Sequence, residues 1–307
     1  MKKLITIVGP TAVGKTDLTL ALAKGYNGEV ISGDAYQVYK QLNIGTAKPT
    51  TDELAAVPHH LINILEPDDD YSVSIFQQQA RTLIDSLNQN QILPILSGGT
   101  GLYVQSLLEN YNFNDIKPNI ELRAELDELY ANQGIDGLRH RANELAKVGH
   151  INIRFTDKHR LYRAIELMTA GDFDALTSQT KDGLSYEGPV IGLQRERSDL
   201  YDRINRRVEI MFEKGLVDEV KQLLIKGVNP NCQAFKGIGY KEVVQYLEGL
   251  ISYDACVDLI QKNTRHFAKR QITWYKRMPY IEWITIDSQT TEAEIYGMAC
   301  NIIDSRF

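Results

Sequence analysis

The sequence predicts an α/β fold: a parallel sheet covered by helices on both faces, with an all-helical segment inserted into it. In the first hundred residues, short runs that are apolar throughout alternate with helical patterns, which is typical of parallel strands buried on both faces. Directly after the first apolar run, residues 9–16 read Gly-Pro-Thr-Ala-Val-Gly-Lys-Thr and match G-x-x-x-x-G-K-S/T, the pattern of a phosphate-binding loop. From Ile120 to about Gly171 the pattern is helical throughout. We therefore expect a P-loop NTPase-like core at 1–114 and 188–307, and a helical insertion at 115–187.

The first core elements follow from local patterns. The apolar run at residues 4–8 predicts a strand, and the segment rich in Leu and Ala after the loop predicts a helix at 15–25. A second strand is expected at 29–32, followed by a loop region that reaches His60. Apolar positions at helical spacing predict a helix at 74–89. The run at 92–96 predicts a buried strand that ends in Ser-Gly-Gly-Thr.

The later elements are mainly helical. Helices are expected in the insertion near 121–132, 136–147 and 157–170, with turns at Gly134 and Gly149 between them. A strand signal returns at 189–193. The remaining sequence predicts long helices at 198–214, 216–226, 239–248 and 253–277, then a strand at 281–286 and a terminal helix.

Composition excludes several classes of protein. The chain has 307 residues, of which 43% are hydrophobic and 24% charged, as in ordinary globular proteins. No stretch is apolar and long enough to span a bilayer, and the N-terminal Met-Lys-Lys leads straight into a core strand, so we expect no cleaved signal peptide. Three cysteines, Cys232, Cys256 and Cys300, lie far apart. We therefore expect a cytoplasmic protein without disulfides or a zinc site.

Local charge departs from the net charge of −6. Six Lys or Arg and no acid lie between Leu259 and Ile281, and five Arg against three acids lie between Arg195 and Arg207. Basic faces on an acidic protein favour selective binding of a polyanion, although a solvated helix face is the simpler interpretation of any single run.

The phosphate-binding loop predicts a diphosphate or triphosphate ligand. Consecutive backbone N–H groups in front of a helix N-terminus bind phosphate oxygens. Lys15 adds a cation, and the hydroxyl of Thr16 is placed to bind Mg²⁺. The loop consists of Gly9, Pro10, Thr11, Ala12, Val13, Gly14, Lys15 and Thr16.

Two further strand ends should meet this loop, because ligands of parallel sheets bind at the carboxyl ends of the strands. They are residues 34–37 and residues 98–100. Asp34 is suited to hold Mg²⁺, bind a hydroxyl or accept a proton, or else it is a turn or capping residue. The strand at 92–96 ends without the acid that motor-type NTPases use for Mg²⁺, which favours group transfer over a hydrolytic cycle.

Two other groups of residues remain ambiguous from spacing alone. Arg203 and Arg207 share one face of a predicted helix and suit diphosphate oxygens, but an ion-paired surface helix fits equally well. Tyr240 and Lys241 follow Gly-Ile-Gly at the start of a helix, which is either functional or simply a turn.

Taken together, the motifs resemble those of the bacterial tRNA dimethylallyltransferases, also called tRNA isopentenyltransferases. The Gly-Thr-Ala-Lys-Pro and Arg-Gln-Ile-Thr-Trp segments are not features of nucleotide kinases. The matching motifs run in order along nearly the whole chain, at residues 9–16, 34–39, 43–49, 58–61, 71–72, 98–103, 157–163, 200–204 with Arg207, 237–242 and 269–274.

This resemblance implies prenyl transfer from dimethylallyl diphosphate to the exocyclic N6 of the adenosine at position 37 of tRNA, next to the anticodon. Asp34 matches the proposed general base, and the phosphate-binding loop would hold the diphosphate leaving group. Lys15, Mg²⁺ on Thr16, and Arg207 would stabilise the negative charge that grows there, with Arg203 as a second candidate. Thr100 matches a residue near the target nucleotide.

The resemblance also implies a tRNA surface. The adenosine has to leave the base stack to reach a buried base, and the insertion would grip the anticodon stem-loop. Gln37 matches the residue that reads a neighbouring base, and Ala35 stands where the family usually has Ser. The tRNA-binding residues implied are Asp34, Ala35, Tyr36, Gln37, Thr100, Arg123, Thr156, Asp157, Lys158, His159, Arg160, Lys236, Gly237, Ile238, Gly239, Tyr240 and Lys241.

Other functions share parts of this pattern. A P-loop kinase of small metabolites has the same loop and an acceptor-site acid, and a prenyltransferase that acts on free AMP has the same core. An RNA-binding module with a relict loop is a third, non-enzymatic alternative. The insertion and the basic segments favour RNA as the acceptor. We expect a monomer that binds tRNA and dimethylallyl diphosphate and does not bind membranes.

Overall fold

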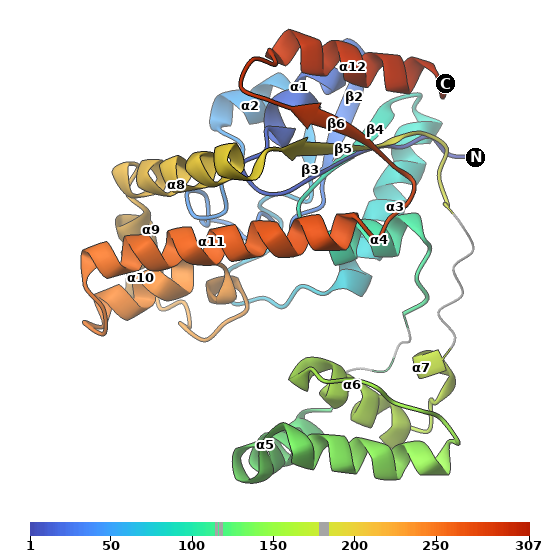
Figure 1. Cartoon of the computed structure of the whole chain (residues 1–307), viewed down its shortest axis with the longest axis vertical. Helices are drawn as coiled ribbons and strands as arrows, with labels where there is room; N and C mark the ends of the chain where they lie inside the picture. Colours follow the sequence, from blue (N-terminus) through green and yellow to red (C-terminus); the bar gives the residue numbers. More distant parts are fainter. Residues whose placement is uncertain (114–115, 117–118, 178–183) are drawn as a thin grey trace. The chain divides into compact units, whose positions relative to one another are not determined.

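The computed structural model describes residues 1–113, 116, 119–177 and 184–307 (Figure 1). The chain forms two compact units. The core unit comprises residues 1–109 and 183–307, and the helical unit comprises residues 110–182. The expected boundary at 114–115 lies outside the described residues. Residues 184–187, which we expected in the insertion, belong to the core unit, where Glu187 forms a parallel bridge with Lys3.

The core unit contains a parallel sheet, as the sequence predicted. In the described part of the chain the sheet has six strands in the order β3-β2-β4-β1-β5-β6, and every neighbouring pair is parallel. The strands are β1 Ile5–Val8, β2 Gly28–Ser32, β3 His59–His60, β4 Leu93–Ser97, β5 Val190–Arg195 and β6 Ile281–Ile286.

Helices connect the strands and cover the sheet (Figure 1). They are α1 Lys15–Gly25, α2 Thr51–Ala56, α3 Val73–Gln89, α4 Gly101–Leu108, α8 Arg197–Glu213, α9 Leu216–Ile225, the 3-10 helix Ala234–Lys236, α10 Tyr240–Leu247, α11 Tyr253–Tyr275 and α12 Glu292–Asp304. The region that we expected to be loop up to His60 contains α2 and β3. Helix α2 has no apolar stripe, since none of its residues is buried, and it begins at a capping box formed by Thr50 and Glu53.

Alternating side chains of the strands fill two hydrophobic clusters. Ile5 and Ile7 of β1 pack in a cluster with Leu22 of α1 and Ile303 of α12. Val8 and Leu96 belong to the other cluster, which includes side chains from α3, α4 and α11. Successive residues of a strand point to opposite faces, so these apolar runs are buried on both sides. Figure 1 shows α1 and α12 on one side of the sheet and α4 and α11 on the other.

The strand order places β1 between β4 and β5 near the middle of the sheet. The loops that follow β1, β2 and β4 therefore leave the sheet from one edge, where parallel sheets bind their ligands. This edge carries the phosphate-binding loop, Asp34 and Thr100.

The helical unit contains α5 Ile120–Val148, α6 Lys158–Thr169 and α7 Asp174–Thr177. Gly134 interrupts α5 with φ 63° and ψ −156°, so this element is two helices meeting at a kink, close to the turn that we expected there. Leu126, Leu138 and Ile165 lie in the separate hydrophobic cluster of this unit. None of the helices built from described residues is both long and apolar enough to cross a membrane.

Candidate functional site

The loop between β1 and α1 requires its glycines. Gly9 has φ 147°, and a Cβ added there would lie 2.7 Å from the carbonyl oxygen of Leu193. Gly14 is the N-cap of α1 in the left-handed region, with φ 111°. Ala12 also has a positive φ, 65°, which is costly for a residue with a side chain. The backbone path of the loop therefore depends on positive φ angles, which the two glycines adopt easily and Ala12 adopts at a cost.

This path presents backbone donors. The N–H groups of Val13, Gly14, Lys15 and Thr16 donate to no acceptor in the described part of the chain. They lie at the N-terminus of α1, where the helix dipole adds positive potential. Thr16 is exposed beside them. Free amides at a helix N-terminus are a binding site for phosphate oxygens.

Lys15 lies within the loop. Its Nζ donates to the carbonyl oxygens of Gly9 at 2.9 Å and Pro10 at 2.8 Å. Burial, together with the nearby Arg207, lowers the pKa of Lys15 from 10.5 to about 7, and Asp34 opposes this shift. A phosphate oxygen would stabilise the ammonium form, because the opposite charge favours the protonated state.

Helix α8 supplies the arginines that surround the loop. Arg203 Nε donates to the carbonyl oxygen of Ala12 at 2.9 Å, and Arg207 contacts Thr11 Oγ1 at 3.5 Å. Burial lowers the pKa of Arg207, and the neighbouring Arg203 lowers it further. Both predicted arginines therefore lie against the loop, and neither forms an ion pair with another described residue, although Arg203 is exposed.

A third arginine, Arg195, was not singled out as a site residue. Its Nε donates to the carbonyl oxygen of Val13 at 3.0 Å, and its Nη1 pairs with Asp199 at 2.9 Å. Arg195 ends β5, the strand beside β1, so the sheet order brings it to the loop. Its place in the basic run from Arg195 to Arg207 was the only sequence signal for this contact.

Asp34 follows β2 and is partly buried. Its Oδ1 accepts the N–H groups of Tyr36 at 2.8 Å and Gln37 at 3.3 Å, while Oδ2 has no partner among the described residues. Burial raises the pKa of Asp34, and these two hydrogen bonds together with Lys15 and Lys48 oppose the rise. A carboxylate with one free oxygen and a raised pKa is a stronger base than an exposed one.

Thr100 lies beside Asp34. Its Oγ1 accepts the N–H of Ala35 at 3.1 Å, and its own N–H donates to the carbonyl oxygen of Gly33 at 3.3 Å. Gly98 makes this approach possible, since an added Cβ would lie 2.3 Å from the carbonyl oxygen of Gly33. The ends of β2 and β4 therefore meet as we expected from the strand-end rule.

Lys48 was also missed as a site residue. Its Nζ donates to the carbonyl oxygen of Tyr39 at 2.7 Å and to the side-chain oxygens of Asn43 at 3.1 Å and Asn63 at 2.6 Å. Burial lowers the pKa of Lys48 to about 8, opposed by Glu219 and Asp34. It lies in the Gly-Thr-Ala-Lys-Pro motif, so the motif was the available signal. Its charge favours the ionised form of Asp34.

Gln37 is engaged with its neighbours in this structure. Its Oε1 accepts the hydroxyl of Ser32 at 3.0 Å, and its Nε2 donates to the carbonyl oxygen of Thr46 at 3.3 Å. The donor contacts are long, so the carboxamide is only weakly held on that side. Reading a base would exchange these contacts for new ones.

The segment from Lys236 to Lys241 packs against the same region. A Cβ added to Gly237 would lie 3.2 Å from the ring of Tyr36, and Gly45 lies against the ring of Tyr240. Tyr240 is fully buried and its hydroxyl donates to Glu219 at 2.7 Å, so its side chain has a structural role. Within this segment the side chains open to solvent include those of Lys236 and Lys241.

The remaining predicted tRNA residues lie in the helical unit. Arg123 forms a bidentate ion pair with the buried Glu166, in which Nε donates to Oε1 at 2.6 Å and Nη2 donates to Oε2 at 3.2 Å. Asp157 caps α6 by accepting the N–H of Arg160 at 3.1 Å, and Lys158 Nζ donates to Asp127 at 2.8 Å. Exposed side chains at this helix start belong to Thr156, Asp157, His159 and Arg160.

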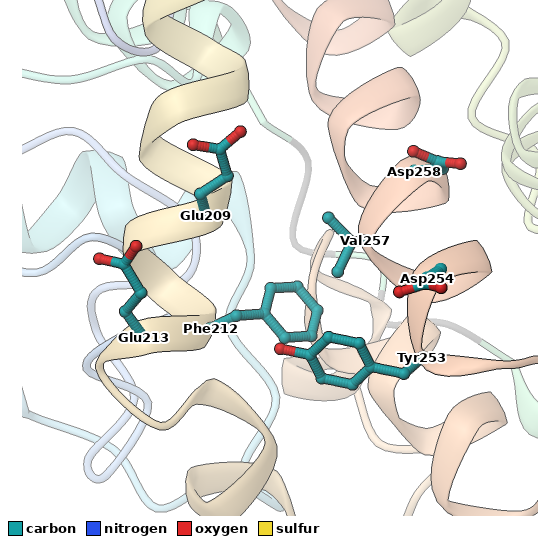
Figure 2. Close-up of a pocket in the computed structure, with 7 residues that line it drawn as sticks. All are labelled: Glu209, Phe212, Glu213, Tyr253, Asp254, Val257 and Asp258. Carbon is teal, nitrogen blue, oxygen red and sulfur yellow. The ribbon is translucent and has the colours of Figure 1, made fainter.

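A separate hollow of about 520 Å³ lies between α8 and α11 (Figure 2). Figure 2 shows the rings of Phe212 and Tyr253 side by side between the two helices, and their centroids are 5.2 Å apart. Four carboxylates stand around the rings, and two of them, Glu209 and Glu213, pair with Arg206. Its lining is Glu209, Phe212, Glu213, Tyr253, Asp254, Val257 and Asp258. Negative charge of this density repels a diphosphate, so the hollow is not the anion site.

The described residues contain no group of three or more His, Cys, Asp or Glu side chains that could hold a metal by themselves. The exposed hydroxyl of Thr16, next to the free amides of the loop, is nonetheless a hard oxygen donor. Mg²⁺ commonly takes one or two protein oxygens and completes its shell with substrate phosphates and water. Thr16 therefore fits a magnesium ion that arrives with a diphosphate.

Comparisons with known proteins find similar sequences along nearly the whole chain. A family model described as IPP transferase matches residues 37–278, and one described as isopentenyl transferase matches residues 2–63. A tRNA dimethylallyltransferase of Carboxydothermus hydrogenoformans is 44% identical over 294 residues, covering 95% of this chain and 94% of that protein. One from Alkaliphilus oremlandii is 41% identical over 292 residues, covering 94% and 92%.

Solved structures agree as well. The tRNA isopentenylpyrophosphate transferase from Bacillus halodurans has a TM-score of 0.75 and 38% identity, covering 100% of this chain and 98% of that chain. A eukaryotic dimethylallyltransferase acting on tRNA has a TM-score of 0.79 and 25% identity, covering 100% of this chain and 81% of that chain. The resemblance that the ordered motifs indicated is thereby confirmed.

Proposed function

The chain belongs to the IPP transferase family, and we propose that it transfers a dimethylallyl group from dimethylallyl diphosphate to N6 of the adenosine at position 37 of tRNA. The observation that carries this proposal is that one edge of the sheet brings together groups that bind anions and a carboxylate that can accept a proton. The phosphate-binding loop after β1 carries free backbone amides and has cations around it. Asp34 follows β2, on the other side of β4 from β1, and has a carboxylate oxygen without a partner among the described residues. The first set suits a leaving diphosphate, and the second suits a proton acceptor.

The leaving group determines the role of the loop. As the bond between the allylic carbon and the diphosphate oxygen breaks, negative charge grows on the diphosphate. The N–H groups of Val13 to Thr16 stabilise that charge, and so do Lys15 and Arg207. Arg203 and Arg195 donate to the carbonyl oxygens of Ala12 and Val13, so they hold the loop in the conformation that exposes these amides.

The acceptor determines the role of Asp34. The lone pair of the adenine amino group is delocalised into the ring, so the amine is a weak nucleophile. Removal of its proton by Asp34 as the C–N bond forms contributes about 10²–10⁴-fold to the rate. Thr100 holds the N–H of Ala35 and so positions the adjoining Asp34. Lys48 favours the ionised carboxylate that the reaction requires.

Mg²⁺ bound to Thr16 and the diphosphate would help to neutralise the negative charge of the leaving group.

The nucleotides around the target adenosine would be contacted by residues near Asp34 and by two exposed lysines. These residues are Ala35, Tyr36, Gln37, Lys236 and Lys241. In the helical unit, Arg123 and residues 156–160 are the proposed contacts to the anticodon stem-loop. We propose that the protein works as a monomer in the cytoplasm.

The experiment that tests the function is mass spectrometry of tRNA nucleosides after incubation with Mg²⁺ and dimethylallyl diphosphate. The expected product is an adenosine heavier by one dimethylallyl group, formed in an anticodon stem-loop that carries adenosine 37. Parallel reactions contain free AMP as acceptor or ATP with small metabolites. Prenylated AMP with unmodified RNA would assign the AMP-prenylating activity, and phosphoryl transfer from ATP would assign a kinase.

A further inference from the structure

Gln271 joins two loops of the site that are far apart in sequence. It lies in α11 and only 5% of it is exposed. Its Oε1 accepts the N–H of Thr11 in the phosphate-binding loop at 2.9 Å. Its Nε2 donates to the carbonyl oxygen of Gly99, in the loop after β4, at 2.8 Å. One carboxamide thus uses its acceptor on one loop and a donor on the other.

The surroundings fit this bridge closely. A Cβ added to Gly99 would lie 2.4 Å from Gln271 Nε2, so a glycine is needed for the approach. Trp274, nearly one turn further along α11, lies against Gly101, and the hydroxyl of Tyr275 donates to the carbonyl oxygen of Gly98 at 3.3 Å. One turn of α11 therefore lines the loop that ends in Thr100.

We propose that Gln271 is a positioning residue that couples the diphosphate loop to the general base. The contacts form a continuous path from Thr11 through Gln271 to Gly99, from Thr100 to Ala35, and so to Asp34. Displacement of either loop strains the other, because the same side chain makes a hydrogen bond to the backbone of each loop. The inference rests on the proposed prenyl transfer, in which both loops act on one reaction.

Glutamine is the side chain that this position requires. An ionised glutamate of the same shape accepts the N–H of Thr11 but cannot donate to Gly99, and it places a negative charge beside the diphosphate. A protonated glutamate donates through its O–H and accepts through its carbonyl, as the carboxamide does. Methionine has a similar length and makes neither hydrogen bond.

The test compares Gln271→Met and Gln271→Glu with the wild-type enzyme, measuring kcat and KM for both substrates from pH 5.5 to 8.5. We expect Gln271→Met to lower kcat about 10- to 100-fold at every pH, since two hydrogen bonds of the site are lost. We expect Gln271→Glu to be impaired at pH 8.5 and to recover relative to wild type as the pH falls, because the buried carboxyl becomes protonated.

The matched control is Gln261→Glu, on the same helix, where Nε2 donates to the carbonyl oxygen of Asn205 at 3.4 Å. The ratio of the kcat of Gln261→Glu to the wild-type kcat should not vary with pH. Thermal unfolding measures the stability of each variant. If both Gln271 variants unfold at lower temperature but keep wild-type kcat and KM, Gln271 is merely structural and the inference is overturned. If Gln271→Met does not fold, the pH recovery of Gln271→Glu decides: recovery supports the coupling and its absence refutes it. An inactive wild-type enzyme would instead refute the proposed function.

Discussion

Thr100 Oγ1 accepts the backbone N–H of Ala35 at 3.1 Å, which ties the start of α4 to the residue beside Asp34. Thr100 is the N-cap of α4, yet its side chain makes no capping hydrogen bond to that helix. The hydroxyl is therefore used across the sheet edge rather than within its own element. Since the N–H of Thr100 also donates to the carbonyl oxygen of Gly33 at 3.3 Å, Thr100 contacts the residues on both sides of Asp34, whose Oδ1 accepts the N–H groups of Tyr36 and Gln37.

Replacing Thr100 by valine should lower kcat about tenfold. Valine keeps the shape but leaves the N–H of Ala35 without its acceptor, so the position of Asp34 is less restrained. Thr100→Ser restores the oxygen and should restore most of the rate. Steady-state kinetics with a stem-loop substrate checks this, and equal rates for the valine and threonine enzymes would remove Thr100 from the positioning of Asp34.

Asp34→Asn should lower turnover by about 10²-fold or more while tRNA affinity changes only a few-fold. The asparagine oxygen accepts the same two backbone N–H groups, so the turn is retained while the basic oxygen is lost. Single-turnover rates and filter binding separate the two effects. Asp52→Asn, at an exposed acid in α2, is the control and should behave as wild type. Normal turnover of Asp34→Asn would mean that another group accepts the proton.

Arg207→Ala should raise KM for dimethylallyl diphosphate or lower kcat by roughly 10- to 100-fold, since it removes a charge-assisted contact to the leaving group. Its neighbour in sequence supplies the control. Arg206 is 64% exposed and pairs with Glu209 at 3.0 Å, so Arg206→Ala should have little effect. Similar kinetics for the two variants would assign Arg207 to the packing of the loop.

Binding of dimethylallyl diphosphate at pH 8 should take up a proton. In the free enzyme the pKa of Lys15 is about 7, so the Lys15 side chain is mostly neutral at pH 8. The anionic ligand favours the ammonium form of Lys15. Affinity should therefore rise as the pH falls from 9 to 7 and become flat below that. Calorimetry in two buffers of different ionisation enthalpy measures the uptake. Lys15→Met should abolish it, and uptake that persists in this variant would assign the proton to another group.

Binding of tRNA should weaken steeply with salt, because lysines and arginines displace counterions from phosphates. Lys236→Ala and Lys241→Ala should each reduce the slope of log affinity against log salt by about one, without changing which nucleoside is modified. Lys24→Ala, an exposed lysine at the end of α1, is the control. Unchanged slopes for both variants would place the RNA on another surface.

Much of the fold was predictable because it is encoded locally. Apolar runs such as Ile5–Val8 form strands buried on both faces, and Gly9 and Gly14 supply backbone conformations that other residues adopt at a cost. The carboxyl ends of parallel strands lie at one edge of the sheet, which is why the sequence predicted that Asp34 and Thr100 lie near the loop. The short α2 and β3 escaped prediction because neither has an apolar stripe of useful length.

The sequence by itself determined the loop with the phosphate-binding pattern, the sheet that carries it and the acid after the second strand, because these depend on contiguous residues and on periodicity. Only the tertiary structure decided which distant side chains hold that loop. Arg195 and Arg203 reach the carbonyl oxygens of Val13 and Ala12, and Gln271 reaches Thr11, across separations of 182, 191 and 260 residues. Such partners depend on how β5, α8 and α11 pack around the sheet, and no local pattern specifies that packing.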